Sequence, residues 1–466
     1  MHPTTFLSRA LLAAALLGQG LTTAALASGT GGVTGGGVVG VTGGGTGGGT
    51  GGTTGGGGST GTVVVTAVPG EILLKLKSGD ALQPLLAKYP VTLVSRFGAR
   101  PIYRLQVVGT ARVRDVLAGL VLEPGVMIAE VNGIHQSPEA RRNVAWTIGS
   151  PQAYVAQWAP RALRLPEAHA LATGAGIRVA VIDTGVDRNH PLLAVRLLPG
   201  FDFVDFDSDP SEQGSVGNAG FGHGTHVAGL VAMVAPGAKI MPIRALDADG
   251  VGNAWVLGEA LLYAVDPDGN PATDDGAQVI NLSLGSLSRT RLIAAIASIA
   301  SCSSAIDDDP ISDRSDPGYN DDAVRCRQGR GAIVVAAAGN DASNGIQEYP
   351  AAEGAYGLLA VTASTATTRL ASFSNFGSWI DIAAPGEGLT SAFPGGGYAT
   401  WSGTSMASPL AAGVAALLLS VDATTPTGDI VRRIKRSSAM LCGTSFRQVD
   451  AAAALTNRVP APISCP

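Results

Sequence analysis

The stretch Ser402-Gly403-Thr404-Ser405-Met406-Ala407-Ser408-Pro409 delivers a serine to the start of an apolar run that continues to Leu419. The run predicts a helix over residues 405–419, with Ser405 in its first turn. Backbone N–H groups in the first turn of a helix lack intrahelical partners, and the positive end of the helix dipole lies there. Negative charge that develops beside the Ser405 hydroxyl is therefore stabilised. Ser405 is a candidate nucleophile, although serines at such positions are most often only N-caps.

A nucleophilic serine needs a base and a group that orients the base. Asp183 follows the β-branched run 178–182, which puts a carboxylate at the carboxyl end of a buried strand, where it requires a partner. His223 lies in Gly-His-Gly-Thr-His-Val-Ala-Gly at the start of a helical stretch, and an imidazole pKa near neutrality suits a general base. Asn340 ends the apolar run 334–339, and its amide could donate to an oxyanion beside the backbone N–H of Ser405.

Each of these motifs has a competing interpretation. Asp-Thr-Gly at Asp183 is also the signature of aspartic proteases, but those need two carboxylates that share a proton, and this sequence contains one such tripeptide. His223 and His226 are three residues apart, but there is no His-Glu-x-x-His and no third zinc ligand nearby in the sequence. Gly-Asn at Asn340 is by itself a turn signal. An esterase of the α/β-hydrolase class would require Gly-x-Ser-x-Gly around Ser405, which is absent.

Together, in the chain order Asp, His, Asn, Ser, the motifs resemble those of the subtilisin-like serine proteases over about residues 155–457. The resemblance implies that Ser405 is the nucleophile, His223 the general base and acid, Asp183 the orienting carboxylate and Asn340 the oxyanion donor. The implied activity is peptide-bond cleavage through an acyl-enzyme. The implied partners are protein or peptide substrates.

The resemblance also implies a substrate-binding cleft. The segments Ser283-Leu284-Gly285 and Ala336-Ala337-Ala338 would line an extended substrate strand and its main pocket. The residue before a Tyr-Pro pair lies at the floor of that pocket in the family, and here it is Glu348. We hypothesise that this carboxylate favours Arg or Lys before the scissile bond, because charge complementarity in a partly dry pocket is worth several kcal/mol. A solvent-facing Glu348 is the alternative.

Composition limits the function classes. The 466 residues carry 31 basic and 36 acidic side chains, a net charge of −5, with no basic block, so nothing suggests nucleic acid or an anionic membrane as partner. Residues 1–27 are typical of a secretory signal, with an apolar stretch too short to span a bilayer and Ala25-Leu26-Ala27 as the cleavage pattern. We therefore expect a secreted protein with no membrane attachment in its mature form. Residues 28–62, almost wholly Gly and Thr, predict a flexible linker.

Two folded units are expected after the linker. Residues 63–142 alternate strand-like and helical segments in the order βαββαβ, which is typical of a small ferredoxin-like α+β unit. By resemblance this unit is an inhibitory pro-domain, an intramolecular inhibitor that is later cut away. Its polar end, 138–143, is expected to be exposed to proteolysis, and Arg141-Arg142 lies where self-processing would need a basic site. Residues 143–466 form the catalytic domain, an α/β fold whose near-continuous apolar strands predict a parallel sheet with helices on both faces.

Four cysteines in an exported chain favour disulfides over free thiols. Of the three possible pairings, proximity favours Cys302 with Cys326 and Cys442 with Cys465, whereas four buried free thiols remain the alternative. The acidic stretch between the first pair, 307–322, is expected to be a solvated, bridged loop.

No cofactor is needed for the implied chemistry, but two acidic inserts offer oxygen ligands for structural calcium. The first, 202–209, contains Asp205, Asp207 and Asp209, and the second is 266–275. Solvated turns are the alternative for both. The calcium loop that many secreted family members carry is missing here, because the Val-Ala-Gly and Val-Ala-Pro runs are only four residues apart. A further alternative for the whole chain is a subtilisin-like scaffold used for adhesion or binding without catalysis.

Overall fold

The computed structural model describes residues 67–466, except for 99, 143, 303–323, 356, 464 and 466. The predicted leader, the predicted linker, the first residues of the predicted pro-domain and the acidic stretch 307–322 lie outside the described residues.

A nine-stranded sheet forms the centre of the larger unit, in the order β16-β17-β13-β12-β11-β10-β6-β8-β7. Every neighbouring pair from β7 to β17 is parallel, and only β16 runs antiparallel to β17. Because the strands are buried on both faces, they are continuous apolar runs. Their bounds are β6 Arg178–Asp183, β7 Phe201–Asp202, β8 Lys239–Arg244, β10 Val279–Leu282, β11 Ile333–Ala337, β12 Leu358–Ser364, β13 Ile382–Pro385, β16 Ala439–Met440 and β17 Arg447–Gln448.

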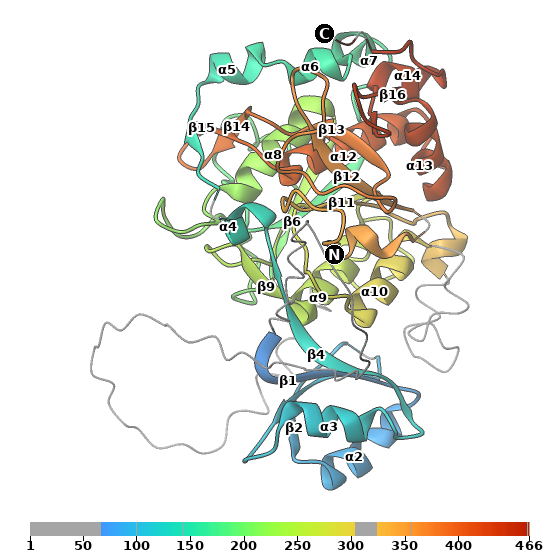
Figure 1. Ribbon diagram of the computed structural model, residues 1–466. Helices are drawn as coiled ribbons and strands as arrows, with labels where there is room; N and C mark the ends of the chain where they lie inside the picture. The colour runs from blue at the N-terminus through green and yellow to red at the C-terminus, as the bar shows by residue number, and fades with distance from the viewer. Residues whose placement is uncertain are drawn as a thin grey trace, which may run out of the picture.

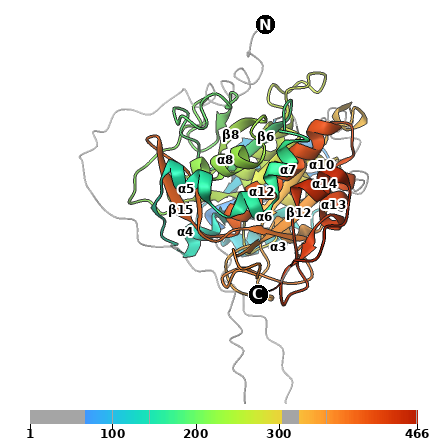
Figure 2. The same ribbon diagram turned by 90° about the horizontal axis from the view of Figure 1, so that it is seen from above.

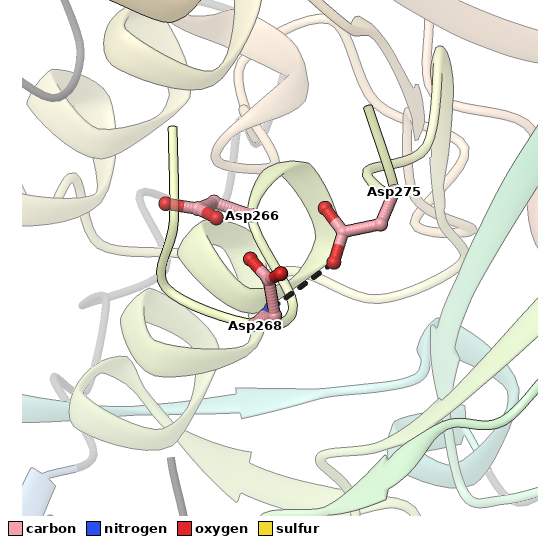
Figure 3. Close-up of side chains that lie close together, drawn as sticks. All are labelled: Asp266, Asp268 and Asp275. Atoms are coloured by element: carbon pink, nitrogen blue, oxygen red, sulfur yellow. Dashed lines mark hydrogen bonds between the residues drawn. The ribbon is translucent and has the colours of Figure 1, made fainter. Parts of the chain in front are cut away.

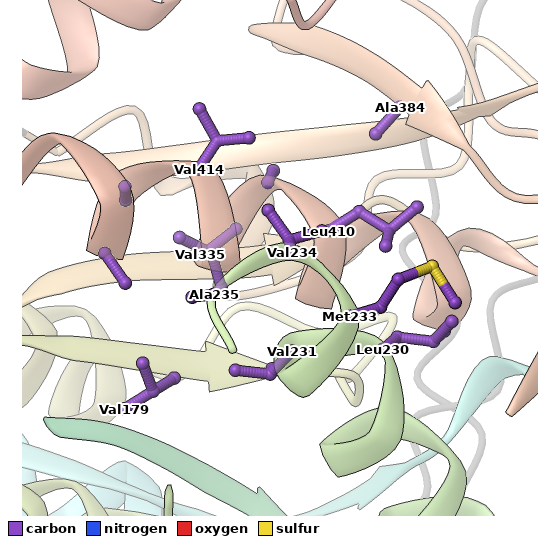
Figure 4. Close-up of a cluster of buried hydrophobic side chains, with 14 of the residues drawn as sticks. Val179, Leu230, Val231, Met233, Val234, Ala235, Val335, Ala384, Leu410 and Val414 are labelled. Atoms are coloured by element: carbon purple, nitrogen blue, oxygen red, sulfur yellow. The ribbon is translucent and has the colours of Figure 1, made fainter. Parts of the chain in front are cut away.

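Alternate residues of each strand point to opposite faces and build two cores. Val179 and Val181 of β6 face one core, together with α8 and α12, and Figure 4 shows side chains from these two helices meeting those of β6, β11 and β13. Ala180 and Ile182 face the other core, with α9 and α10. The helices of the first face are α5 Pro151–Ala156, α6 Ala159–Ala162, α7 Leu165–His169, α8 His223–Val234, α12 Thr404–Val421, α13 Thr427–Arg436 and α14 Ala451–Thr456, and Figure 2 looks down on them. Those of the second are α9 Ala254–Val265 and α10 Arg291–Ser301.

Helix α12 is the central helix of the first core. It is 18 residues long with a mean hydropathy of 1.6, which would suffice for a membrane span by length and composition, but 89% of it is buried inside the protein. It is therefore a core helix, and it brings Ser405 to the carboxyl-end edge of the parallel sheet.

The N-terminal unit is a four-stranded antiparallel sheet with two helices on one face, in the order β2-β3-β1-β4. This confirms the element order that the sequence predicts. The bounds are β1 Ala67–Leu76, α2 Leu82–Lys88, β2 Val91–Arg96, β3 Ile102–Val107, α3 Val113–Leu120 and β4 Val126–Gln136. In Figure 1 this unit lies below the larger one, and β4 runs out of the small sheet up to the short helix α4, Pro138–Arg142.

The small unit docks on the first turns of α9 and α10. The carboxylate of Glu130 accepts hydrogen bonds from the backbone N–H groups of Arg291 and Leu292, both at 3.0 Å. Asn132 Oδ1 accepts one from the N–H of Trp255, also at 3.0 Å. Side chains of β4 therefore satisfy helix N–H groups that otherwise lack partners. The indole of Trp255 meets the ring of Phe97 edge-on, with centroids 5.0 Å apart.

β4 extends to Gln136, because its second half pairs with β9, Val251–Asn253, of the other unit. A separate small sheet joins β14 Leu389–Phe393, β15 Gly397–Trp401 and β5 Thr147–Ile148, and short 3-10 turns cover Gly79–Ala81 and Ala351–Glu353.

Both disulfides favoured from the sequence are present. Cys302 is bonded to Cys326 and Cys442 to Cys465. None of the described cysteines is free.

Candidate active site

Asp183 and His223 meet at the carboxyl-end edge of the sheet. Asp183 is the last residue of β6 and His223 the first of α8, and the imidazole Nδ1 lies 2.7 Å from Asp183 Oδ1. The same carboxylate oxygen accepts a hydrogen bond from the N–H of Thr184 at 2.8 Å. Both side chains are fully buried. The contact holds one ring nitrogen of His223 and leaves Nε2 facing away from the carboxylate.

Ser405 lies in the first turn of α12, as the sequence predicts. Pro409 is inside this helix, and because proline has no N–H, the carbonyl of Ser405 lacks its usual helical donor. The hydroxyl of Ser283 donates to that carbonyl instead, at 2.9 Å. Ser283, predicted as a substrate-binding residue, thus also supports the turn that carries Ser405, and its neighbour Leu284 packs into the second core.

Asn340 follows β11, and its side-chain amide contacts Thr404, the residue before Ser405. Its Oδ1 accepts two hydrogen bonds from Thr404, from the N–H and from the hydroxyl, each 2.9 Å long. With the amide oxygen held in this way, the NH₂ group is left to donate elsewhere, and it donates to Glu139 Oε1 at 2.7 Å. An oxyanion donor requires this orientation.

The side chain of Glu139, from α4, lies between these groups. Its Oε2 accepts hydrogen bonds from the hydroxyl of Ser405 and from His223 Nε2, the latter at 3.1 Å. Its Oε1 accepts one from Asn340 Nδ2 at 2.7 Å. A Cβ on Gly403 would lie only 1.7 Å from Oε1, so the site is open to this carboxylate because residue 403 is glycine. His223 and Ser405 therefore contact the same oxygen atom.

Two carboxylates now flank one imidazole. Burial disfavours the imidazolium, but Asp183 and Glu139 outweigh it and raise the pKa of His223 to about 10. Burial acts against ionisation of Glu139 too, yet the hydrogen bonds from His223, Ser405 and Asn340 hold the pKa of Glu139 below its usual value. At neutral pH the arrangement is an imidazolium between two carboxylates.

The chain leading to Glu139 lies between two backbone segments of the larger unit. Residues 134–136 of β4 pair antiparallel with β9, and on the other side Gln136 exchanges two backbone hydrogen bonds with Gly285, at 2.8 and 2.9 Å. The segment is thus the middle strand of three. The sequence resemblance predicts that Gly285 pairs with an extended substrate, and here a segment of the same chain takes that position.

Glu348 is fully buried and binds the same segment through Arg141. The guanidinium of Arg141 binds both of its carboxylate oxygens, at 2.9 and 2.7 Å. Asp341 binds Arg141 at 3.2 Å and also Arg142. Burial raises the pKa of Glu348, and Arg141 opposes that rise. A Cβ on Gly285 would lie 2.5 Å from Glu348 Cγ, so the Glu348 side chain fits here because residue 285 is glycine.

The prediction that the segment 138–143 is exposed was wrong in its first part. Pro138 and Glu139 are buried, and of the described residues of this segment only Arg142 is exposed. Charged composition indicated a surface loop, but the charges find partners across the unit boundary. Sequence reasoning also missed Asp341 and the contacts of Glu139, although Asp341 directly follows Asn340.

The two acidic inserts differ as possible metal sites. In the first, Asp205 binds Arg244 at 2.6 Å and Asp209 binds Arg188 at 3.1 Å, so arginines neutralise these candidate calcium ligands. In the second, oxygens of Asp266, Asp268 and Asp275 lie within 4.8 Å of one another, the only such group among the described residues (Figure 3). An Asp275 oxygen accepts the N–H of Asp268 at 3.2 Å. Burial and the neighbouring carboxylates raise the pKa of Asp266 to about 6. Beyond these acids nothing points to an ion, and we assign none.

The chain is similar in sequence and in fold to known proteins. The model of the subtilase family, a peptidase family, matches residues 174–456. A thermophilic serine proteinase from Bacillus sp. (strain AK1) is 35% identical over 68% of this chain and 69% of its own length. Thermitase from Thermoactinomyces vulgaris is 36% identical over 59% of this chain and 86% of its own. The crystal structure of fervidolysin from Fervidobacterium pennivorans, described as a keratinolytic enzyme related to subtilisin, has a TM-score of 0.63 at 22% identity and covers 84% of this chain and 62% of that one.

The fold and the relatives define a subtilisin-like serine endopeptidase. The chain belongs to the subtilase family. The alternative of a binding scaffold without catalysis is not favoured, because the relative that matches more than two thirds of this chain and of its own length is named a serine proteinase.

Proposed function

We propose that the chain is the precursor of a secreted endopeptidase that cuts peptide bonds with Ser405, His223 and Asp183, and that it removes its own N-terminal unit. The observation that carries this proposal is the convergence of Ser405, His223 and Asn340 on one small group, the Glu139 carboxylate. A reacting carbonyl placed there would have a nucleophile, a base and an oxyanion donor within reach.

The proposed reaction follows from these positions once Glu139 has left. His223 Nε2 takes the proton of Ser405 as the hydroxyl attacks the carbonyl carbon. Asp183 holds Nδ1–H and stabilises the imidazolium, and the NH₂ of Asn340 with the backbone N–H of Ser405 binds the oxyanion. His223 then gives its proton to the leaving amine, and water hydrolyses the acyl-enzyme in a second round of the same steps.

The precursor is proposed to be inactive for two reasons. Glu139 Oε1 accepts the Asn340 hydrogen bond that an oxyanion would accept, so a substrate carbonyl is excluded. In addition, a His223 whose pKa is raised to about 10 is protonated at neutral pH and cannot act as a base. The N-terminal unit is thus an intramolecular inhibitor whose last helix, α4, blocks the site.

A preference for Arg or Lys before the scissile bond is the third part of the proposal. Its support is the arginine that already occupies the pocket, because Arg141 binds the buried Glu348 with two hydrogen bonds. For self-cleavage, α4 would unwind, Glu139 would leave, and the carbonyl of Arg141 or Arg142 would reach Ser405. Matched peptides with Arg, Lys, Leu or Phe before the cleaved bond test this preference, and faster turnover of the Leu or Phe peptide would remove the idea.

Secretion and self-processing are tested together by expressing the full chain and the S405A variant in a protease-deficient host. We expect wild-type protein in the medium with a new N-terminus near residues 142–143. The S405A protein should keep its N-terminal unit. A new N-terminus of S405A at the same residue would show that another protease makes the cut. Structural calcium is not part of this proposal.

A further inference from the structure

Helix α8, which begins at His223, has no capping side chain of its own. The residue before it is Gly222, and the N–H groups of the first turn find partners elsewhere. That of His223 donates to the carbonyl of Gly220 at 3.0 Å. That of Gly224 donates to the hydroxyl of Thr184 at 2.9 Å. The next, of Thr225, donates to a carboxylate oxygen of Glu212 at 3.2 Å.

Glu212 comes from the segment between β7 and α8 and joins the two parts of the chain that carry Asp183 and His223. Its Oε2 accepts a second hydrogen bond from the hydroxyl of Thr225, at 2.8 Å. That hydroxyl accepts the N–H of Asp187 at 2.9 Å. The N–H of Glu212 donates to the carbonyl of Val186 at 3.3 Å. The backbone of Glu212 therefore contacts the loop that follows Asp183. Its side chain contacts the first turn of α8, which carries His223.

This junction is closely packed. A Cβ on Gly185 would lie 2.9 Å from the nitrogen of Glu212, so the two segments approach this closely because residue 185 is glycine. A carboxylate at a helix N-terminus is stabilised by the helix dipole. Burial raises the pKa of Glu212 to about 7, whereas the hydroxyls of Thr184 and Thr225 oppose that rise.

We propose that Glu212 is a positioning residue for the peptidase reaction: it caps α8 from outside the helix and thereby fixes the His223 imidazole against Asp183. The inference rests on the roles proposed above for His223 and Ser405. Glu212 touches neither substrate nor Ser405 in this account. Its effect is on the rate of proton transfer and not on substrate binding.

The test compares the processed forms of wild type, E212A and E212Q, with active sites counted by burst titration. The variant E212A leaves the Thr225 N–H and hydroxyl without an acceptor, so the imidazole loses its fixed position. We expect kcat to fall about tenfold to a hundredfold, because misplaced reacting groups lower the reaction rate by such factors. KM should stay unchanged. The amide oxygen of E212Q can still accept both hydrogen bonds, so kcat should return close to the wild-type value.

The control is D450A. Asp450 caps α14 by accepting the N–H of Ala453 at 2.8 Å, so this variant also loses a carboxylate cap, but on a different helix. Its kcat should equal that of wild type. A kcat of E212A no lower than that of D450A would overturn the inference, as would a loss that E212Q fails to restore.

If E212A yields no folded protein, the variant E212D, whose carboxylate is withdrawn by one methylene, replaces it with the same criteria. The S405A variant separates the two proposals, because activity in S405A would contradict the proposed function itself.

Discussion

At the scale of single residues, the charge on His223 depends on which carboxylates lie beside it. Asp183 contacts Nδ1 and Glu139 contacts Nε2, and their combined effect raises the pKa of the imidazole to about 10. Only Asp183 belongs to the proposed triad. Departure of Glu139 would remove one of the two raising effects and lower the pKa of His223 toward the range that a general base needs.

Glu348 gives a residue-scale prediction about specificity. The variant E348Q keeps the shape of the pocket but removes its buried charge. Hydrogen bonds to charged groups contribute about 1.5–3 kcal/mol, so kcat/KM for a peptide with Arg before the scissile bond should fall about tenfold to a hundredfold. The Leu peptide should lose nothing. E353Q is the matched control, because Glu353 pairs with Arg289 instead, and it should leave both peptides unchanged. Equal losses for the Arg and Leu peptides would contradict the role of Glu348.

The sequence could predict Asp183, His223, Asn340 and Ser405 because each stands in a local motif at a strand end or a helix start. Glu139, Asp341 and Glu212 could not be found in that way. Glu139 contacts Ser405 across 266 residues, Asp341 contacts Arg141 across 200, and Glu212 contacts Thr225 across 13. No local pattern records which distant group a charged side chain meets.

At the scale of elements, the fate of α4 decides whether the site is open. Glu139 of α4 helps to raise the pKa of His223, so His223 takes up a proton when α4 binds. The binding of α4 therefore weakens as pH rises toward about 10, where His223 loses that proton. The pKa of Glu139 is lowered, so its contribution is present above its usual value of 4.5 and is lost as pH falls below it. The contact is therefore strongest in mildly acidic solution.

Self-processing of the precursor should accordingly speed up as pH rises toward about 10, the raised pKa of His223 in the precursor. In E139Q the same rise should occur at lower pH, because only Asp183 then raises the His223 pKa. Quenched time courses on gels at a series of pH values measure this. E123Q, at a glutamate that pairs with Lys88 in the same unit, should follow wild type. A pH profile for E139Q identical to wild type would contradict the account of α4.

For the whole molecule, one apolar core is shared by the two units. Leu73, Phe97 and Ile102 of the N-terminal unit pack into the second core, which also contains residues of α9 and α10. The alternation of apolar strands and helices in the sequence predicts each unit separately. It could not predict that β4 crosses from one to the other, because the partner of its second half, β9, is more than a hundred residues away.

Removal of residues 63–142 tests the importance of this shared core. The truncated chain would expose the apolar surface around Trp255, and we expect little or no active enzyme to be recovered from the medium. Removal of residues 28–62, the predicted linker, is the matched control and should leave recovery near the wild-type value. Normal secretion and activity without residues 63–142 would count against an inhibitory and folding role for the unit.

The most direct measurement of the central claim is covalent labelling of the processed enzyme with phenylmethylsulfonyl fluoride, followed by peptide mapping. The account predicts one sulfonylated residue, Ser405, with loss of activity in proportion to labelling. It also predicts no labelling in the H223A variant or in precursor that still holds Glu139 in the site. Labelling of a different serine, or full activity in enzyme whose Ser405 is modified, would contradict it.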